Sequence, residues 1–262
     1  RLRQDLVSSW LAAAGARAST RALLDKVPDL ERLTNRVRAL SATPRDLSAL
    51  GLGLAQLPNL IESASLAAIE THITPIEDVC TLIEASIAED PPVSLGAGDA
   101  IRLGFDDELD ELKKVSGEAQ SYIAGLESTA RDETGIKSLK VGYNKVFGYY
   151  IEVSRPNLHA VPDEWDRRQS LVGGERFITP DLKEYEARVL TARDQISEVE
   201  RTVFRRVCVQ VTSYAEMIMT SARAVAELDA ICSLAQAAAD SGWVRPALDD
   251  GDVLDIKAGR HP

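Results

Sequence analysis

Residues 138–186 read SLKVGYNKVFGYYIEVSRPNLHAVPDEWDRRQSLVGGERFITPDLKEYE and form the one strongly β-like stretch of this chain. LKVGYN and GYYIEVS alternate between apolar and polar residues on either side of Lys145-Val146-Phe147, which predicts a β-hairpin. RRQSLV and ERFIT flank Gly173-Gly174, which predicts a second tight turn. Because one hairpin alone is marginally stable, we expect both to join in a four-stranded, mainly antiparallel sheet. Its expected core consists of Val141, Tyr149, Ile151, Val153, Leu171, Phe177 and Ile178.

Long helical patterns lie on both sides of this stretch. A helix is expected to start at Asp106, with apolar residues at helical spacing as far as Leu126. After the stretch, no Gly or Pro occurs from residue 183 to 241, with a break expected near residues 211–220. A seven-residue repeat predicts that the second helix pairs with the first, as in a coiled coil; its members are Leu182, Val189, Ile196 and Val203. The predicted fold is therefore mainly α: a helical bundle with a long antiparallel arm and a small four-stranded sheet inserted at the tip.

Two Thr-Pro pairs mark further helix starts. Thr43-Pro44-Arg45-Asp46 combines an N-cap residue with Pro at the first helical position and an acid in the first turn. Thr74-Pro75-Ile76-Glu77 fits the capping-box pattern, in which Glu77 reaches back to the amide of the cap residue. Residues 90–104 are rich in Gly and Pro and are expected to form a loop, with a short strand at residues 100–103 as an open alternative.

The composition indicates a soluble protein of one or two domains. The chain has 262 residues, of which 45% are hydrophobic and 27% charged. No run of about 18 apolar residues occurs, so no membrane span is expected. The three cysteines are interpreted as buried thiols of a reducing cytoplasm. The sequence lacks an initiator Met and a closing element, so we expect a piece of a longer cytoplasmic protein.

The motifs of several catalytic classes are missing from the sequence. The patterns GxxxxGK[ST], GxGxxG, HExxH and GxSxG do not occur, and no Cys/His spacing suits zinc. The acidic run Asp106–Glu111 is interpreted as a solvated first turn that suits the helix dipole, and not as a metal site. We therefore expect no catalytic site, no metal and no cofactor in this chain.

Basic residues of the β-like stretch are the candidates for a functional site. The net charge of the chain is −11, but residues 131–185 hold nine basic and nine acidic residues, so this part alone does not repel a polyanion. Basic side chains donate to phosphate oxygens without reading base sequence. Gly173 and Gly174 would let backbone amides approach a phosphate closely. The alternative is an ordinary solvated surface, in which Arg176 pairs with Glu175 or Asp181. The candidate side chains are Lys145, Arg155, Arg167, Arg168 and Arg176.

Two long motifs, LKVGYNKVFGYYIEVSR (139–155) and RRQSLVGGERFITPDLKEYE (167–186), closely resemble the clamp segment of MutS-type DNA mismatch repair proteins. Shorter motifs along the rest of the chain resemble the lever region of that family; they are RQDLV (3–7), VPDLERL (27–33), PRDLSAL (44–50), DELDELKK (107–114), AVAELDAICSLA (224–235) and AGRHP (258–262). The resemblance covers essentially the whole chain.

This resemblance implies an organisation and a function. Residues 1–130 would be the first lever segment, 131–185 the DNA clamp, 186–257 the returning lever segment and 258–262 the start of the junction to an ATPase domain. Family members are dimers that encircle DNA, recognise mismatches and hydrolyse ATP. The implied partners are double-stranded DNA, gripped by its backbone, a second copy of the parent chain, and downstream repair proteins. ATP and Mg²⁺ would belong to the parent protein and not to this chain.

The resemblance also implies site residues at two places. Asn157 matches a polar position that contacts DNA, and the turn with Gly173 matches one that often carries Lys-Asn in the family. Here this turn reads Val172-Gly173-Gly174, so that only its backbone amides could serve. The alternative function is a non-enzymatic helical scaffold whose β insert docks a protein partner. A steep fall of DNA affinity with salt would distinguish DNA gripping from docking of a protein.

Overall fold

The computed structural model describes residues 2–66, 71–144, 148–257 and 259. Within this part of the chain the structure is mainly helical and contains one small four-stranded antiparallel sheet, which confirms the predicted fold class. The chain divides into two compact units, residues 1–93 with 204–262 and residues 94–203. The domain boundaries expected at residues 130, 185 and 257 stay a prediction.

The first unit is built from helices that share an apolar core. Its long helix α9 packs against α1, α2 and α3, while α4 packs against α3 and α6. Leu47, Leu50 and Leu54 recur at helical spacing on α4 and are fully buried, because this stripe faces the neighbouring helices. The helices of this unit are α1 (Leu2–Ala12), α2 (Ala14–Leu24), α3 (Leu30–Arg38), α4 (Pro44–Leu54), α5 (Leu57–Leu66), α6 (Glu77–Ser86) and α9 (Ala215–Ser241).

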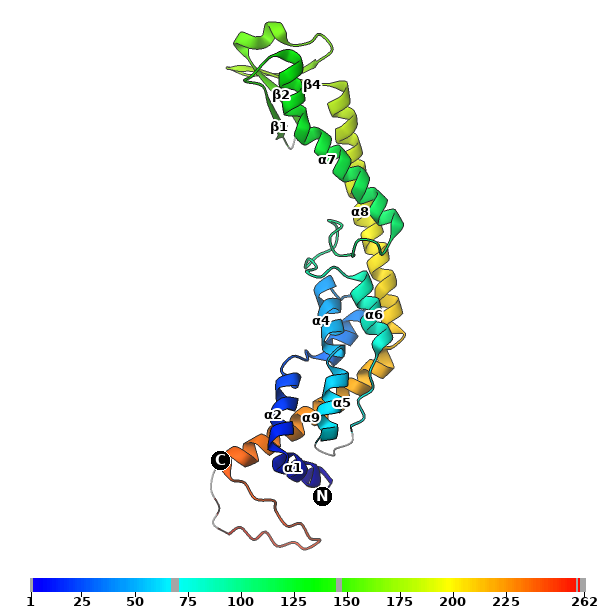
Figure 1. Ribbon diagram of the computed structural model, residues 1–262, viewed down its shortest axis with the longest axis vertical. Helices are drawn as coiled ribbons and strands as arrows, with labels where there is room; N and C mark the ends of the chain where they lie inside the picture. The colour runs from blue at the N-terminus through cyan, green and yellow to red at the C-terminus, as the bar shows by residue number, and fades with distance from the viewer. Residues whose placement is uncertain (1, 67–70, 145–147, 258, 260–262) are drawn as a thin grey trace. The chain divides into compact units, whose positions relative to one another are not determined.

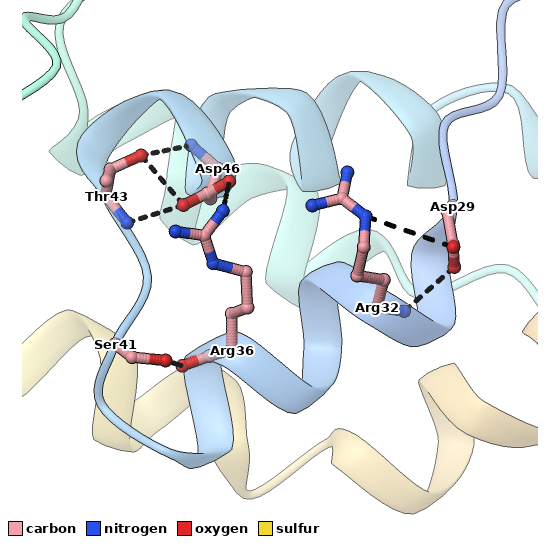
Figure 2. Close-up of polar contacts among 6 residues, drawn as sticks. All are labelled: Asp29, Arg32, Arg36, Ser41, Thr43 and Asp46. Atoms are coloured by element: carbon pink, nitrogen blue, oxygen red, sulfur yellow. Dashed lines mark hydrogen bonds and ion pairs between the residues drawn. The ribbon is translucent and has the colours of Figure 1, made fainter.

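The predicted start of α4 is confirmed by a complete capping box, drawn in Figure 2. The Thr43 hydroxyl accepts from the Asp46 amide at 3.2 Å, and the Asp46 carboxylate accepts from the Thr43 amide at 2.7 Å. Arg36, near the end of α3, donates to the same carboxylate at 2.9 Å. Asp46 therefore joins the end of α3 to the start of α4.

The capping box predicted at Thr74 is wrong. Helix α6 begins at Glu77 with Ile76 as its N-cap residue, and no side chain bonds to the cap. The backbone of Thr74 bonds instead to Ser221 of α9, whose hydroxyl accepts from the Thr74 amide and lies 3.1 Å from the Thr74 carbonyl oxygen. Ser221, which is distant in sequence, thus bonds the Thr74 amide that Glu77 would have bonded in a capping box.

The second unit contains α7 (Asp107–Thr134), the sheet and the first part of α8 (Pro180–Thr212). The chain enters the sheet from α7 and leaves it through α8, and the two helices lie side by side, as predicted (Figure 1). The rings of Tyr122 on α7 and Tyr185 on α8 stack with centroids 3.7 Å apart. The predicted seam of α8 is buried at each of its four positions, which are Leu182, Val189, Ile196 and Val203. The predicted break near residues 211–220 is also confirmed, because α8 ends at Thr212 and α9 begins at Ala215.

The sheet has the strand order β1-β2-β4-β3, and each neighbouring pair is antiparallel. The strand pairing of both predicted hairpins is confirmed, as β1–β2 and β3–β4, while residues 145–147 between β1 and β2 lie outside the described residues. One edge strand, β3, is short and exposed and carries a register shift between Arg167 and Gln169. Ile151, Val153, Phe177 and Ile178 are buried against α7 and α8, and Val141 and Tyr149 are partly buried there. The strands are β1 (Lys140–Asn144), β2 (Gly148–Ser154), β3 (Asp166–Ser170) and β4 (Gly174–Ile178), and a 3-10 helix, η1 (Arg155–Ala160), follows β2.

Among the described residues, no helix is both long and apolar enough to cross a membrane.

Candidate nucleic-acid interface

The candidate surface lies where β2 ends, η1 begins and β3 turns into β4. Ser154 pairs with Gly174 across the strands β2 and β4. The Arg155 amide donates to the Gly173 carbonyl at 3.0 Å, and the Leu171 amide donates to the Gly174 carbonyl at 2.8 Å. These bonds hold the first residue of η1 beside the β3–β4 turn. Arg155, Asn157 and the two glycines, predicted separately, are thus brought to one end of the sheet.

The two glycines of the turn have different environments. Gly174 is buried, and a Cβ at this position would collide with the carbonyl oxygen of Val153 on β2. Its lack of a side chain is thus explained by the close approach of β2, which the sequence did not reveal. Gly173 is exposed with open space around it, and Val172 beside it is 94% exposed. Of the turn, Val172 and Gly173 are the residues that a ligand can reach.

Asn157 is the centre of a small polar cluster at this end of the sheet. Its side-chain nitrogen donates to the Ser138 hydroxyl at 2.9 Å and to the Ser154 hydroxyl at 3.2 Å. The two hydroxyl oxygens lie 3.2 Å apart, and either can donate to the other. Both amide hydrogens of Asn157 are therefore used, which leaves one serine hydroxyl hydrogen for an external acceptor.

Sequence reasoning missed Ser138 and Ser154. The only available signal was their position: Ser138 lies shortly before β1, and Ser154 is the last residue of β2. A serine at a strand end is too common to indicate a site by itself. The pairing of β1 with β2 brings the two hydroxyl groups together.

Two of the predicted arginines are already paired within the sheet. Arg176 donates to Glu152 at 3.0 Å and to Gln169 at 3.0 Å, and its guanidinium lies 4.1 Å from the centre of the Tyr150 ring. The alternative that Arg176 forms an ion pair is therefore confirmed, but the predicted partners Glu175 and Asp181 are wrong, because the acid is Glu152. Glu175 instead accepts from Arg167 at 3.3 Å. Both guanidinium groups have a carboxylate that offsets their charge.

The other predicted basic residues differ from this pair. Arg155 and Arg168 are exposed, and within the described residues neither side chain forms a hydrogen bond or an ion pair. Arg168 lies at the register shift of β3. Lys145 lies outside the described residues. Its described neighbours Asn144 and Gly148 pair with each other at the end of β2 opposite to Ser154.

Two ionisable side chains of α7 and α8 have raised pKa values. Burial raises the pKa of Tyr122, with a further contribution from the charge of Asp181. Burial also raises the pKa of the Cys208 thiol to about 11, which is unsuitable for a nucleophile near neutral pH. In the part of the chain that the structure describes, no group of three or more His, Cys, Asp or Glu residues could hold a metal ion.

Comparison with known proteins places this fold in a class. Residues 104–195 match the model of MutS family domain IV, which covers α7, the sheet and the first part of α8. Over 99% of its length the chain is 43% identical to the DNA mismatch repair protein MutS of Symbiobacterium thermophilum and to that of Anaeromyxobacter dehalogenans. Over 91% of its length it is 44% identical to MutS of Alkaliphilus oremlandii.

The chain therefore belongs to the MutS family. It spans about 30% of the length of the curated relatives that it matches.

Proposed function

We propose that this chain grips the sugar–phosphate backbone of double-stranded DNA with the end of its β sheet. The observation that carries the proposal is the set of donors at this end, which are the Arg155 side chain and the Ser138–Ser154–Asn157 cluster. Arg168, at the register shift of the exposed edge strand β3, adds a second guanidinium without an acid partner among the described residues. Arginine and hydroxyl donors bind phosphate without reading base sequence. A grip of this kind fits the names of the relatives, which are DNA mismatch repair proteins.

The pairing of the arginines predicts which of them contribute most. Arg167 and Arg176 would have to leave an acid before they could neutralise a phosphate, whereas Arg155 and Arg168 would not. The double variant Arg155→Ala/Arg168→Ala is expected to reduce the affinity for a DNA duplex at about 50 mM salt. The log–log slope of affinity against salt should become shallower by roughly 0.9 for each phosphate that the variant no longer neutralises.

The test is a fluorescence anisotropy titration of a labelled duplex at several salt concentrations. Arg193→Ala is the matched control, because Arg193 is an exposed arginine of α8 outside the sheet. Affinity and salt slope of the double variant equal to those of the wild type would rule out these two arginines as the grip. Flat salt dependence of the wild type, together with binding to a protein partner, would favour the scaffold alternative.

We further propose that, in the whole protein, α7 and α8 transmit the state of an ATPase domain to the sheet. Support comes from α8 itself, since residues 180–203 of this helix belong to one compact unit and residues 204–212 to the other. Val189→Gly, at a buried position of α8 packed with α7 and the sheet, should slow the ATP-dependent release of DNA from the whole protein. Leu190→Gly makes the same change at a neighbouring exposed position and serves as the control. Normal release from the Val189 variant would contradict this coupling.

A further inference from the structure

The outer edge of β1 is covered by two side chains of α7. The Val141 amide donates to the Glu127 carboxylate at 2.9 Å, and Arg131 donates to the Leu139 carbonyl at 2.9 Å. Glu127 and Arg131 also pair with each other at 2.7 Å. The Leu139 carbonyl and the Val141 amide are the kind of backbone groups that a fifth strand would bond. This side-chain pair therefore takes the place of a neighbouring strand.

The other strand of the same hairpin is held from α8. The Tyr149 amide donates to the Glu186 carboxylate at 3.1 Å. The pairing of β2 with β4 begins only at Ile151, so this amide lies beyond the reach of β4. Gly148 next to it has φ +77°, and a Cβ there would overlap the Glu186 carboxylate. The absence of a side chain at Gly148 therefore leaves room for the Glu186 carboxylate.

These contacts differ in kind from the apolar core under the sheet. The core of Ile151, Val153 and Phe177 against α7 and α8 is extensive, but apolar contact has little directional preference. A hydrogen bond from a backbone amide to a carboxylate has a defined distance and angle. Two such bonds, one from each helix and one on each strand of the β1–β2 hairpin, restrict rotation of the sheet on the helix pair.

We infer that Glu127 and Glu186 are positioning residues that fix the orientation of the β1–β2 hairpin, and with it the sheet, on α7 and α8. The inference rests on the proposed function in one respect, since the orientation of the sheet then determines how firmly its end holds the DNA backbone. Neither carboxylate bonds to Asn157 or Gly173. Glu186 bonds Tyr149 at the opposite end of β2, and Glu127 bonds Val141, near the start of β1.

The first readout is hydrogen exchange of the Tyr149 and Val141 amides, measured on the full chain without DNA. Glu186→Ala should accelerate exchange at Tyr149 by about tenfold, because a charge-assisted hydrogen bond is removed. Glu186→Gln keeps an oxygen acceptor at the same reach and should restore slow exchange. Glu127→Ala should act in the same way on Val141. Exposed carboxylates of the same helices provide the controls, Glu184→Ala on α8 and Glu118→Ala on α7.

The second readout is the rate of dissociation from a DNA duplex at low salt. We expect Glu186→Ala to accelerate dissociation several-fold while Glu186→Gln and Glu184→Ala leave it near the wild-type rate. If Glu186→Ala does not fold, Glu186→Asp replaces it, because the shorter side chain no longer reaches the Tyr149 amide.

The outcomes separate the two ideas. Unchanged exchange at Tyr149 and Val141 in the alanine variants would overturn the inference, whatever the DNA data show. If the alanine variants exchange these amides faster but dissociate from DNA at the wild-type rate, the orientation of the sheet does not determine how firmly it holds DNA. A wild-type chain that does not bind duplex at all would overturn the proposed function and that link, while the exchange data would still decide whether the carboxylates fix the sheet.

Discussion

The corner between α3 and α4 and the loop of residues 94–101 are each held by one carboxylate, but under different conditions. Asp46 accepts bonds from Thr43 and has the guanidinium of Arg36 at 2.9 Å. Glu200 on α8 is fully buried and accepts from the amides of Gly96 at 2.5 Å and Ala100 at 2.8 Å. Among the described residues, Glu200 forms no ion pair.

This difference shows that a buried carboxylate can be satisfied by backbone amides without a cation. A half-exposed arginine such as Arg36 adds modestly to stability, because solvent screens the pair. Ala100 is buried and Gly96 is half-buried, so water has little access to the amides that Glu200 binds. The loop of residues 94–101 should therefore depend on Glu200 more strongly than the α3–α4 corner depends on Asp46.

The largest effect is expected from Glu200→Ala. Two backbone donors would lose their acceptor, at a cost of about 1–3 kcal/mol each in the free energy of unfolding. Chemical denaturation measures the loss, and hydrogen exchange should rise at Gly96 and Ala100. Glu198→Ala, an exposed neighbour on α8, is the control. A loss below that of an ordinary surface substitution would show that the loop is held by other contacts.

Gly98→Ala tests the same loop through its backbone conformation and packing. Gly98 has φ +86°, and a Cβ there would lie 2.8 Å from the Ile196 side chain. The substitution should cost roughly 1–3 kcal/mol in the free energy of unfolding. Gly104→Ala is the matched control, because φ is +87° there and nothing lies near the added Cβ. If both variants lose the same stability, contact with Ile196 contributes nothing.

At the surface corner, Thr43→Ala should cost about 1 kcal/mol, the usual value of a helix N-cap. Thermal unfolding of the chain measures this loss. Thr43→Ser keeps a hydroxyl acceptor and should retain most of the stability. A loss for Thr43→Ala as large as that for Glu200→Ala would show that the α3–α4 corner is as sensitive to a lost hydrogen bond as the loop at Glu200.

The smallest effect at neutral pH concerns Cys208, a buried ionisable group of α8 for which burial is the sole cause of the shift. Its pKa is raised from 9.0 to about 11. Because the folded value is the higher one, the neutral thiol favours the folded state below pH 9, and this contribution is lost as the pH rises from about 9 to about 11. Reaction of Cys208 with a thiol reagent at pH 8 should therefore be slow until the chain unfolds. Rapid labelling at Cys208 in the folded chain, located by peptide mapping because Cys80 is less buried, would contradict this. Cys208→Ser should have flatter stability between pH 9 and pH 11.

Local patterns in the sequence predicted local structure well. The cap at Thr43, the two hairpins and the buried seam of α8 each follow from residues close together in the chain, and each is confirmed. The capping box at Thr74 failed although its pattern was equally clear, because Ser221 of α9 bonds to that backbone. A motif fixes structure only when no distant residue offers its backbone groups a better partner.

The candidate site was less predictable, because its features depend on contacts between strands. Arg155, Arg167, Arg168 and Arg176 look alike in sequence. The sheet pairs Arg167 and Arg176 with acids, whereas Arg155 and Arg168 have no acid partner among the described residues. The Glu200 contact joins residues about 100 positions apart, and residues 90–104 were recognised only as a loop. The spacing of residues in the sequence does not indicate an interaction between residues so far apart in the chain.

The irregular edge strand β3 limits the ways in which two copies of this sheet could join. A long regular edge offers a row of unpaired amides and carbonyls to a strand of another molecule, which is a common start of aggregation. Here β3 has only five residues, a register shift and exposed charges at Asp166, Arg167 and Arg168. Two sheets of this kind are poorly suited to join edge to edge. Any association of two copies through this part of the chain has to use side chains and loops, so that the sheets can meet and separate without forming a continuous β structure.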